Sequence, residues 1–337
     1  MSETDGTNRS DSNPEAIYDK VRAETEQVLV GNDTAIEQLT IALLTRGHLL
    51  LEGVPGVGKT TIANLFAHAT NLEYKRIQMT PDVLPADITG THVYRENLGE
   101  FELQRGPIFA NLVVADEINR ATPKTQSALL ESMQERQVTI EGDTLSLPEP
   151  FMVVATQNPV EMEGVFELPE AQRDRFQLKI TIDLPDRTSE EELLERFDEN
   201  PELGPQNITQ AVTTSEILEA RSQAMDVYVA DSVKGYVLDL VEATREHSQV
   251  VHGASPRASL AFLDGAKARA AIHGRNYAIP DDVKVLSESI LAHRLVLGTD
   301  AELNDIKPET VVGNIVSDVE VPDVDSTEGG PIDSQTI

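Results

Sequence analysis

A short glycine-rich run could hold the phosphate groups of a nucleotide. Residues 53–60, Gly-Val-Pro-Gly-Val-Gly-Lys-Thr, match the pattern GxxxxGK[ST] of phosphate-binding loops. Such glycines let successive backbone N–H groups turn toward phosphate at the start of a helix. An apolar stretch at 49–51 precedes the run and a helical pattern at 61–69 follows it, as this motif requires. The residues predicted to contact the nucleotide are Gly53, Val54, Pro55, Gly56, Val57, Gly58, Lys59, Thr60 and Thr61.

The loop and two carboxylates further along the chain could together carry out phosphoryl transfer. Lys59 would reach the β- and γ-phosphates, and Thr60 would ligate Mg²⁺. Asp116 and Glu117 follow an apolar stretch at 112–115, which predicts a buried strand that ends where ligands bind a parallel sheet. Asp116 would hold Mg²⁺, directly or through water, and Glu117 would polarise the attacking water. The sequence therefore predicts ATP hydrolysis, unless the acidic pair merely lies on a solvated surface.

A polar amide follows the next apolar stretch. Asn158 comes soon after residues 151–155, so we expect it at the same sheet edge, where it could orient the attacking water. The alternative is an asparagine that caps a turn before Pro159. The histidines show no metal-ligand spacing, and the absence of cysteine excludes disulfides, thiolate metal sites and cysteine nucleophiles.

The predicted elements that position these residues form an α/β core. Apolar stretches alternate with helical patterns, which is typical of a doubly wound parallel sheet covered by helices on both faces. The predicted strands comprise residues 48–51, 74–79, 112–115, 151–155 and 179–182. Two hairpins are expected to interrupt this core, one turning at 96–100 and the other at 141–143.

Composition and the residues that mark helix starts divide the chain into segments. Prolines at 256 and 280 begin predicted helices, so the second half should form a small all-helical domain. The chain has no Lys or Arg after Lys307, which favours a solvated acidic tail. The predicted segments are a disordered tail at 1–13, the α/β nucleotide-binding domain at 14–185, a connection at 186–212, the helical domain at 213–300 and a disordered tail at 301–337.

Charge and hydropathy narrow the classes of partner. The chain has 337 residues and a net charge of −31, with acid spread over its length, which disfavours nucleic acid as a partner. No apolar run approaches the roughly 18 residues of a membrane span, and the polar start does not resemble a signal peptide, so we expect a cytoplasmic protein. The composition resembles that of proteins from halophilic archaea, in which molar salt screens self-repulsion. The alternative is an ordinary acidic protein.

Several motifs together resemble the MoxR family of AAA+ ATPases. They are the loop at 53–60, the run Ala-Asp-Glu-Ile-Asn-Arg-Ala at 115–121, the helical pattern at 124–135, and the segments at 155–159, 168–172, 175–176 and 255–259. This resemblance implies a P-loop AAA+ core followed by a helical lid. It also implies a ring, with a hexamer expected, in which ATP lies between subunits. The implied activity is ATP-driven remodelling, assembly or metal loading of client proteins, often ones with von Willebrand factor A domains.

The resemblance also assigns roles to single residues. It makes Asn158 the first sensor, Arg175 the arginine finger that reaches a neighbour's γ-phosphate, and Arg257 the second sensor on the lid. Position 173 is Arg where the family usually has an apolar residue, so Arg173 could be the finger instead. The hairpins would face the pore, where Tyr94 and Phe101 either contact a client or pack on each other across the strands.

Other classes of function share parts of this pattern. A nucleic-acid motor of the AAA+ class would need a basic pore or an added DNA-binding domain, and the sequence shows neither. A nucleotide-gated scaffold with little turnover is disfavoured because Lys59, Asp116 and Glu117 are all present. A small-molecule kinase is disfavoured because a Glu suited to activating water follows Asp116.

Overall fold

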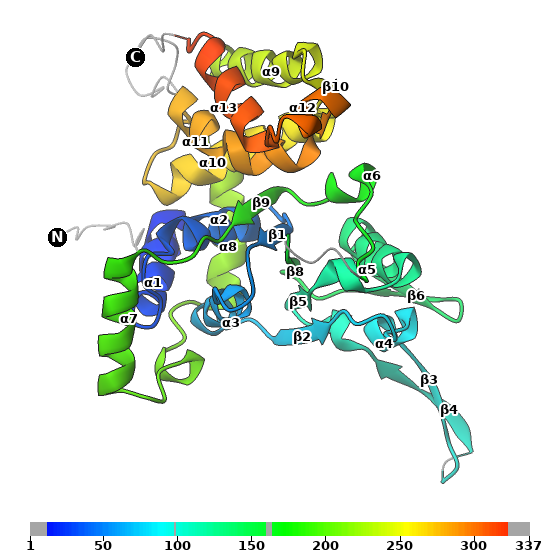
Figure 1. Ribbon diagram of the computed structural model, residues 1–337. Helices are drawn as coiled ribbons and strands as arrows, with labels where there is room; N and C mark the ends of the chain where they lie inside the picture. The colour runs from blue at the N-terminus through cyan, green and yellow to red at the C-terminus, as the bar shows by residue number, and fades with distance from the viewer. Residues whose placement is uncertain (1–11, 98, 160–163, 323–337) are drawn as a thin grey trace, which may run out of the picture.

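The computed structural model describes residues 12–97, 99–159 and 164–322, and it consists of an α/β part and a helical lid (Figure 1). Most of the tail predicted at 1–13 lies outside the described residues, as do residues 323–337 of the tail predicted at 301–337. The α/β part contains the central sheet and a projecting hairpin, and the lid lies at the opposite end of the view from that hairpin.

The central sheet has five parallel strands in the order β2-β5-β8-β1-β9. Its strands are β1 (Leu49–Glu52), β2 (Tyr74–Gln78), β5 (Leu112–Asp116), β8 (Met152–Gln157) and β9 (Leu178–Thr181). These positions confirm the predicted strands and the predicted parallel α/β core. The strand β5, which ends in the acidic pair, is buried along its whole length and lies between two neighbours.

Both faces of this sheet are covered, because alternate residues of one strand enter different cores. On β1, Leu49 and Leu51 pack with the apolar side chains of α1 (Pro14–Thr25), α2 (Asp33–Leu44) and α3 (Lys59–Ala69). Leu50 instead belongs to the core that contains the apolar residues of α5 (Pro123–Glu135). This alternation follows from the two-residue period of a strand, and it confirms the predicted helical cover on both faces.

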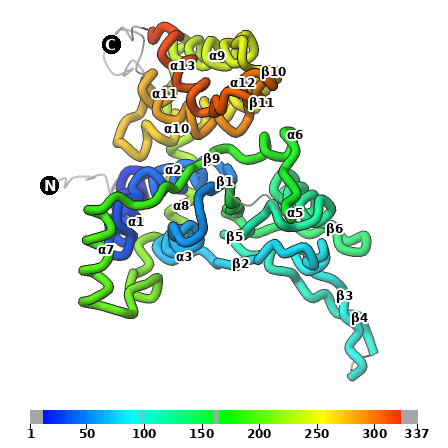
Figure 2. Tube along the Cα trace, in the orientation of Figure 1, coloured from blue at the N-terminus to red at the C-terminus, as the bar shows by residue number. Residues whose placement is uncertain are grey.

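Two antiparallel hairpins interrupt the α/β part, as predicted. The longer one joins β3 (Gly90–Arg95) to β4 (Glu100–Arg105) and projects away from the sheet in Figures 1 and 2. It follows the short helix α4 (Pro85–Thr89). The shorter hairpin joins β6 (Gln137–Ile140) to β7 (Asp143–Ser146).

The strands of the longer hairpin come very close at its base. Gly90 has a φ of +98°, and a Cβ added there would lie 2.3 Å from the carbonyl oxygen of Gln104. Near the tip, Tyr94 and Phe101 face each other with ring centroids 5.3 Å apart. They nevertheless remain 53% and 70% exposed, so they pack on each other and still present an aromatic surface.

The lid is helical, as predicted, and also contains a small two-stranded sheet. Its α-helices are α9 (Asp231–Glu246), α10 (Pro256–Ile272), α11 (Pro280–Leu291), α12 (Thr299–Leu303) and α13 (Pro308–Asp318). The preceding helix α8 (Thr214–Met225) packs against α1 and α2 of the α/β part as well as against α10 (Figure 1). The 3₁₀ helix η4 (Ala292–Arg294) follows α11, and β10 (Val250–His252) pairs with β11 (Val296–Leu297). Ser255 caps α10 by accepting a hydrogen bond from the N–H of Arg257.

Two predicted boundaries are wrong. The region predicted as a tail from 301 instead contains the end of α12 and the whole of α13. In α13, Val311, Val312 and Ile315 are buried in the core of the lid. The apolar residues at helical spacing outweigh the acidic charge around them. The connection predicted at 186–212 contains the helix α7 (Arg187–Glu199), which buries none of its residues and is stabilised by ion pairs between side chains four apart in sequence.

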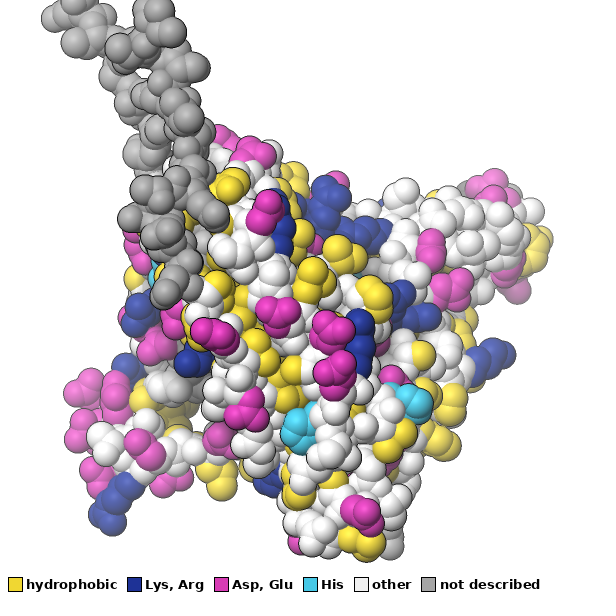
Figure 3. Space-filling view, turned by 90° about the horizontal axis from the view of Figure 1, so that it is seen from above, with side chains coloured by type: hydrophobic (Ala, Val, Ile, Leu, Met, Phe, Trp, Pro, Cys, Tyr) yellow, Lys and Arg dark blue, Asp and Glu magenta, His cyan; other side chains and the backbone are white. Residues whose placement is uncertain are grey.

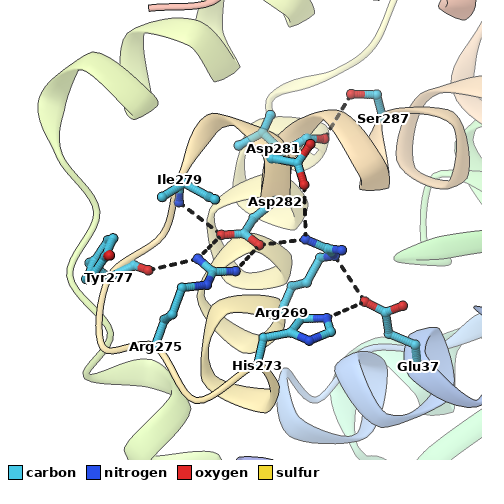
Figure 4. Close-up of polar contacts among 10 residues, drawn as sticks. Glu37, Arg269, His273, Arg275, Tyr277, Ile279, Asp281, Asp282 and Ser287 are labelled. Atoms are coloured by element: carbon cyan, nitrogen blue, oxygen red, sulfur yellow. Dashed lines mark hydrogen bonds and ion pairs between the residues drawn. The ribbon is translucent and has the colours of Figure 1, made fainter. Parts of the chain in front are cut away.

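An ion-pair network ties the lid to the α/β part (Figure 4). Asp282, with no exposed side-chain surface, accepts hydrogen bonds from Arg269, Arg275 and the backbone N–H of Ile279. Arg269 also donates to Glu37 on α2, at 3.0 Å. The charges of this network therefore compensate one another across the contact between the two parts, which a buried carboxylate requires.

Candidate nucleotide site

The glycine-rich loop connects β1 to α3 at the carboxyl end of the sheet. Gly56 and Gly58 have φ values of +88° and +86°, a region that side chains with a Cβ rarely adopt. A Cβ at Gly53 would lie 2.5 Å from the carbonyl oxygen of Ile182. The glycines are thus required by backbone geometry, and the loop leads directly into the N-terminus of α3. This arrangement suits a phosphate group.

The loop side chains lie as phosphate and metal binding would need. The Nζ of Lys59 donates hydrogen bonds to the carbonyl oxygens of Gly53 and Val54, so the ammonium group lies over the loop. The Oγ1 of Thr60 donates to the Oδ2 of Asp116 at 3.3 Å. The structure therefore brings together the two predicted Mg²⁺ ligands from different elements. A hydroxyl and a carboxylate oxygen fit a magnesium ion that keeps several waters and phosphate oxygens as its other ligands.

The two carboxylates have different surroundings. Asp116 is largely buried and also accepts hydrogen bonds from Thr156 and from the guanidinium of Arg76. Glu117 has a φ of +57°, and its N–H donates to Thr156. This left-handed turn directs the chain away from β5 immediately after Asp116. The Glu117 carboxylate is half-exposed and so can face a ligand.

Two residues of β2 contact the acidic pair and were missed by the sequence prediction. Arg76 pairs with Asp116, and the amide of Gln78 donates to the Oε2 of Glu117 at 2.7 Å. Arg120 donates to the same oxygen of Glu117 at 3.2 Å. The only signal in the sequence was two polar residues, two positions apart, near the end of a strand. Their partners depend on the pairing of β2 with β5, which the sequence did not specify.

Asn158 is buried directly after β8, the strand between β5 and β1. It thus follows the strand that separates the acidic pair from the glycine-rich loop. The preceding Gln157 donates from its amide to the Oε1 of Glu52, the last residue of β1. The three strand ends that carry predicted site residues therefore lie at one edge of the sheet, as expected, and their strands are adjacent in it, which the sequence did not specify.

A cavity beside the loop could hold a nucleobase, and no sequence motif pointed to it. It has a volume of about 660 Å³ and borders Gly56, Gly58 and Thr61. Its apolar lining includes Val57, Ile182, Leu184, Leu193 and Phe197. Such a volume and an apolar lining are typical of small-molecule sites. Because these side chains come from segments far apart in the sequence, only the fold assembles the cavity.

A cluster at the other end of β1 contains two of the predicted arginines. Arg175 and Arg257 line a cavity of about 270 Å³ together with Arg46, Arg136 and Arg294, next to the residues that precede β1. Within the described part of the chain, the buried Nε of Arg175 has no hydrogen-bond partner. The structure therefore separates Arg175 and Arg257 from the glycine-rich loop of the same chain.

Arg173 lies on the other side of this segment. It lines a cavity with Gly53, Val54 and Gln157, and thus borders its own loop. Its Nε is also buried without a hydrogen-bond partner among the described residues. The two candidate fingers, only two positions apart, therefore face different regions of the molecule.

The loop, the acidic pair after a buried parallel strand and the helical lid define an ATPase of the AAA class. A model of the "ATPase family associated with various cellular activities (AAA)" matches residues 48–178, and a model of the AAA lid domain matches residues 242–315. The helices of the described residues include none with the length and apolarity needed to cross a membrane.

Similar proteins identify the family. Chaperone MoxR1 of Mycobacterium tuberculosis is 44% identical over 312 residues, which is 90% of this chain and 82% of that protein. Protein MoxR of Methylorubrum extorquens is 31% identical over 81% of this chain and 86% of its own length. The crystal structure of a proposed ATPase from Cytophaga hutchinsonii superposes with a TM-score of 0.85, at 41% identity, over 92% of this chain and 96% of that one. This chain belongs to the MoxR family.

Proposed function

We propose that this MoxR-family ATPase forms a ring, with a hexamer as its expected size, that hydrolyses ATP with Mg²⁺ to remodel, assemble or metal-load client proteins. The contact between Thr60 and Asp116 at the loop supports the hydrolytic site. The proposed ring is supported mainly by the position of Arg175 and Arg257, which lie away from the loop of their own chain. Arginines placed there would complete the site of a neighbouring subunit.

Within the site, each residue has a distinct task. The loop and Lys59 bind and orient the triphosphate, and Glu117 takes up the proton of the attacking water. Asn158 helps to orient that water. Mg²⁺, held by Thr60 and Asp116, would neutralise charge that develops on the phosphate oxygens.

The neighbour would supply two positive charges. Arg175 acts as the finger and Arg257 as the second sensor, because planar guanidinium groups suit charge spread over phosphoryl oxygens. Among the described residues the Nε atoms of Arg173 and Arg175 are both buried without a partner, so their positions, and not this feature, decide between them. Arg173, which borders its own loop, is the less suitable finger.

The client would contact the projecting hairpin. Tyr94 and Phe101 form an exposed aromatic pair near its tip, and aromatic side chains are favoured at interfaces between proteins. The relative named a chaperone supports a protein client, and a von Willebrand factor A domain is the class of client we propose. A nucleic-acid motor is disfavoured by the net charge of −31.

A trapping experiment tests the client role. Tagged Glu117→Gln protein with ATP should retain client proteins from cells of the source organism, because ATP stays bound without turnover. The matched control, Glu117→Gln combined with Lys59→Ala, should bind little ATP and retain few of these proteins, as counted by mass spectrometry. Replacing Tyr94 and Phe101 together with Ser should also release them. Recovery of the same proteins with Glu117→Gln, with the Lys59→Ala control and with the Tyr94 and Phe101 variant would refute the role in client remodelling.

We further propose that the protein is cytoplasmic and that it comes from a halophilic archaeon. Acidic side chains are spread over the whole face visible in Figure 3, with basic groups between them, and the chain has 58 Asp and Glu residues against 27 Lys and Arg. A cytoplasmic location fits the need for ATP, and cell fractionation would test it. The acidic surface implies strong self-repulsion unless salt screens it.

The salt dependence of folding follows from this charge. Lowering KCl from about 2 M to about 0.1 M lengthens electrostatic screening from a few Å to about 10 Å, and should gradually dissociate or unfold the protein. ATP with Mg²⁺ binds only the folded form and should shift the midpoint to lower salt. Circular dichroism over a KCl series, with and without nucleotide, measures both effects. An equal melting temperature at both salt concentrations would refute the halophilic origin but not the ATPase activity.

A further inference from the structure

The carboxylate that precedes Arg175 joins its segment to two elements of the lid. Asp174, the residue before Arg175, follows the short helix α6 (Glu170–Arg173). Its Oδ1 accepts a hydrogen bond from the Nε of Arg294 on η4, at 2.9 Å. Its Oδ2 accepts one from the Oγ of Ser255, the N-cap of α10, also at 2.9 Å. One side chain of the α/β part thus contacts two separate elements of the lid.

Arg294 also donates hydrogen bonds to backbone carbonyl groups. Its guanidinium, only 3% exposed, also donates to the carbonyl oxygens of Phe176 and Gln177, at 2.8 and 3.2 Å, and to that of Ile290. The Phe176 side chain is fully buried in the core of the α/β part. Arg175 therefore lies between a carboxylate and two carbonyl groups that all bond to one buried arginine of the lid.

The second predicted arginine meets the same carboxylate. Arg257 lies two residues after Ser255, at the start of α10, and its guanidinium nitrogen is 3.9 Å from the Oδ2 of Asp174. Arg175, Arg257, Asp174 and Arg294 all line the same cavity of about 270 Å³. Asp174 thus adjoins Arg175 in sequence and Arg257 in space.

We propose that Asp174 and Arg294 are positioning residues that place Arg175 and Arg257 as one unit for a neighbour's nucleotide. This inference rests on the proposed function, in which those two arginines act between subunits. A movement of the lid carries Arg257, Ser255 and Arg294 together, so it must either move the segment at 174–177 or break its bonds to that segment, at Asp174 and at the carbonyl groups of Phe176 and Gln177. The contact thereby couples the position of the lid to the position of the finger.

Replacing Asp174 with Asn tests this role. It keeps the shape but removes the charge that pairs with Arg294 and lies near Arg257, so the finger loses part of the support that fixes its position. We expect kcat for ATP to fall by about ten- to a hundredfold, since a displacement of about 1 Å can cost that much, while the affinity for ATP stays unchanged. The double variant with Arg175→Ala should be no slower than Arg175→Ala alone, because Asp174 acts through Arg175.

The chain offers a matched control. Glu37 also joins the α/β part to the lid, through its ion pair with Arg269 (Figure 4), and its side chain is 16% exposed, the same fraction as that of Asp174. Glu37→Gln should lower the melting temperature without changing kcat. An Asp174→Asn variant that behaves like Glu37→Gln, or a double variant whose two losses multiply, would overturn the positioning role.

A second variant decides the matter if Asp174→Asn does not fold. Ser255→Ala removes one hydrogen bond to Asp174, and we expect kcat to fall severalfold with unchanged ATP affinity and no further loss on an Arg175→Ala background. A wild-type kcat in Ser255→Ala would overturn the inference. Failure of the proposed function has a different signature, because Arg175→Ala would then itself turn over ATP at the wild-type rate.

Discussion

Replacing Glu117 with Gln should lower ATP turnover by about 10²–10⁴-fold, which is the usual contribution of general-base catalysis. The amide keeps the shape of the side chain and can still contact Gln78 and Arg120, but it cannot take up the proton of the attacking water. ATP affinity should therefore remain close to that of the wild type. Phosphate release under steady-state conditions in molar KCl measures turnover, and a fluorescent ATP analogue measures binding.

Two control variants separate catalysis from binding and from charge. Lys59→Ala should weaken ATP binding itself, because its ammonium group lies over the loop. Glu131→Gln removes an exposed carboxylate of α5 and should leave the rate unchanged. If Glu117→Gln kept more than about a tenth of the wild-type rate, the assignment of Glu117 as the base would be wrong.

Mixing inactive subunits should restore activity. Arg175→Ala subunits keep an intact loop but lack the finger, which is worth about 10³–10⁵-fold in rate, whereas Lys59→Ala subunits keep the finger but bind ATP poorly. In an equal mixture about a quarter of the interfaces would combine an intact loop with an intact finger, so turnover should rise toward a quarter of the wild-type rate. A titration of one variant into the other, followed by phosphate release, measures this recovery.

The same mixture made with Arg173→Ala decides between the two arginines. Because Arg173 borders its own loop, its loss should not be rescued by a neighbour. Rescue of Arg173→Ala but not of Arg175→Ala would reverse the assignment. If neither mixture recovered activity, the site would be built within one chain and the proposed ring mechanism would fail.

The sequence predicted the core of this site because each part leaves a local signal. The glycine-rich loop is contiguous, and Asp116 and Asn158 follow apolar strands whose ends meet at one sheet edge. Arg76 and Gln78 could not be assigned in this way. Their roles depend on which strand lies beside β5, and strand order is a property of the whole sheet.

The errors at the two helices have a common physical cause. In α13 the acidic composition suggested a solvated tail, yet Val311, Val312 and Ile315 lie on one helical face and pack into the lid. In α7 no residue is buried, yet Leu193, Leu194 and Phe197 recur at helical spacing and Arg and Glu pair at i, i+4, and the acidic composition outweighed both signals in the prediction. Charge alone therefore did not distinguish helices from unfolded segments.

The separation of the loop from Arg175 by the length of β1 has a consequence for symmetry. An assembly that uses both must join two unlike surfaces, one that receives arginines and one that supplies them. In a ring such a contact is heterologous, because each subunit would give its arginines to one neighbour and receive those of the other. It repeats in one direction until rotation closes it, or else continues as a helical filament. The proposed ring or filament would therefore have a polarity, and any open form would leave one nucleotide site at its end without a donor.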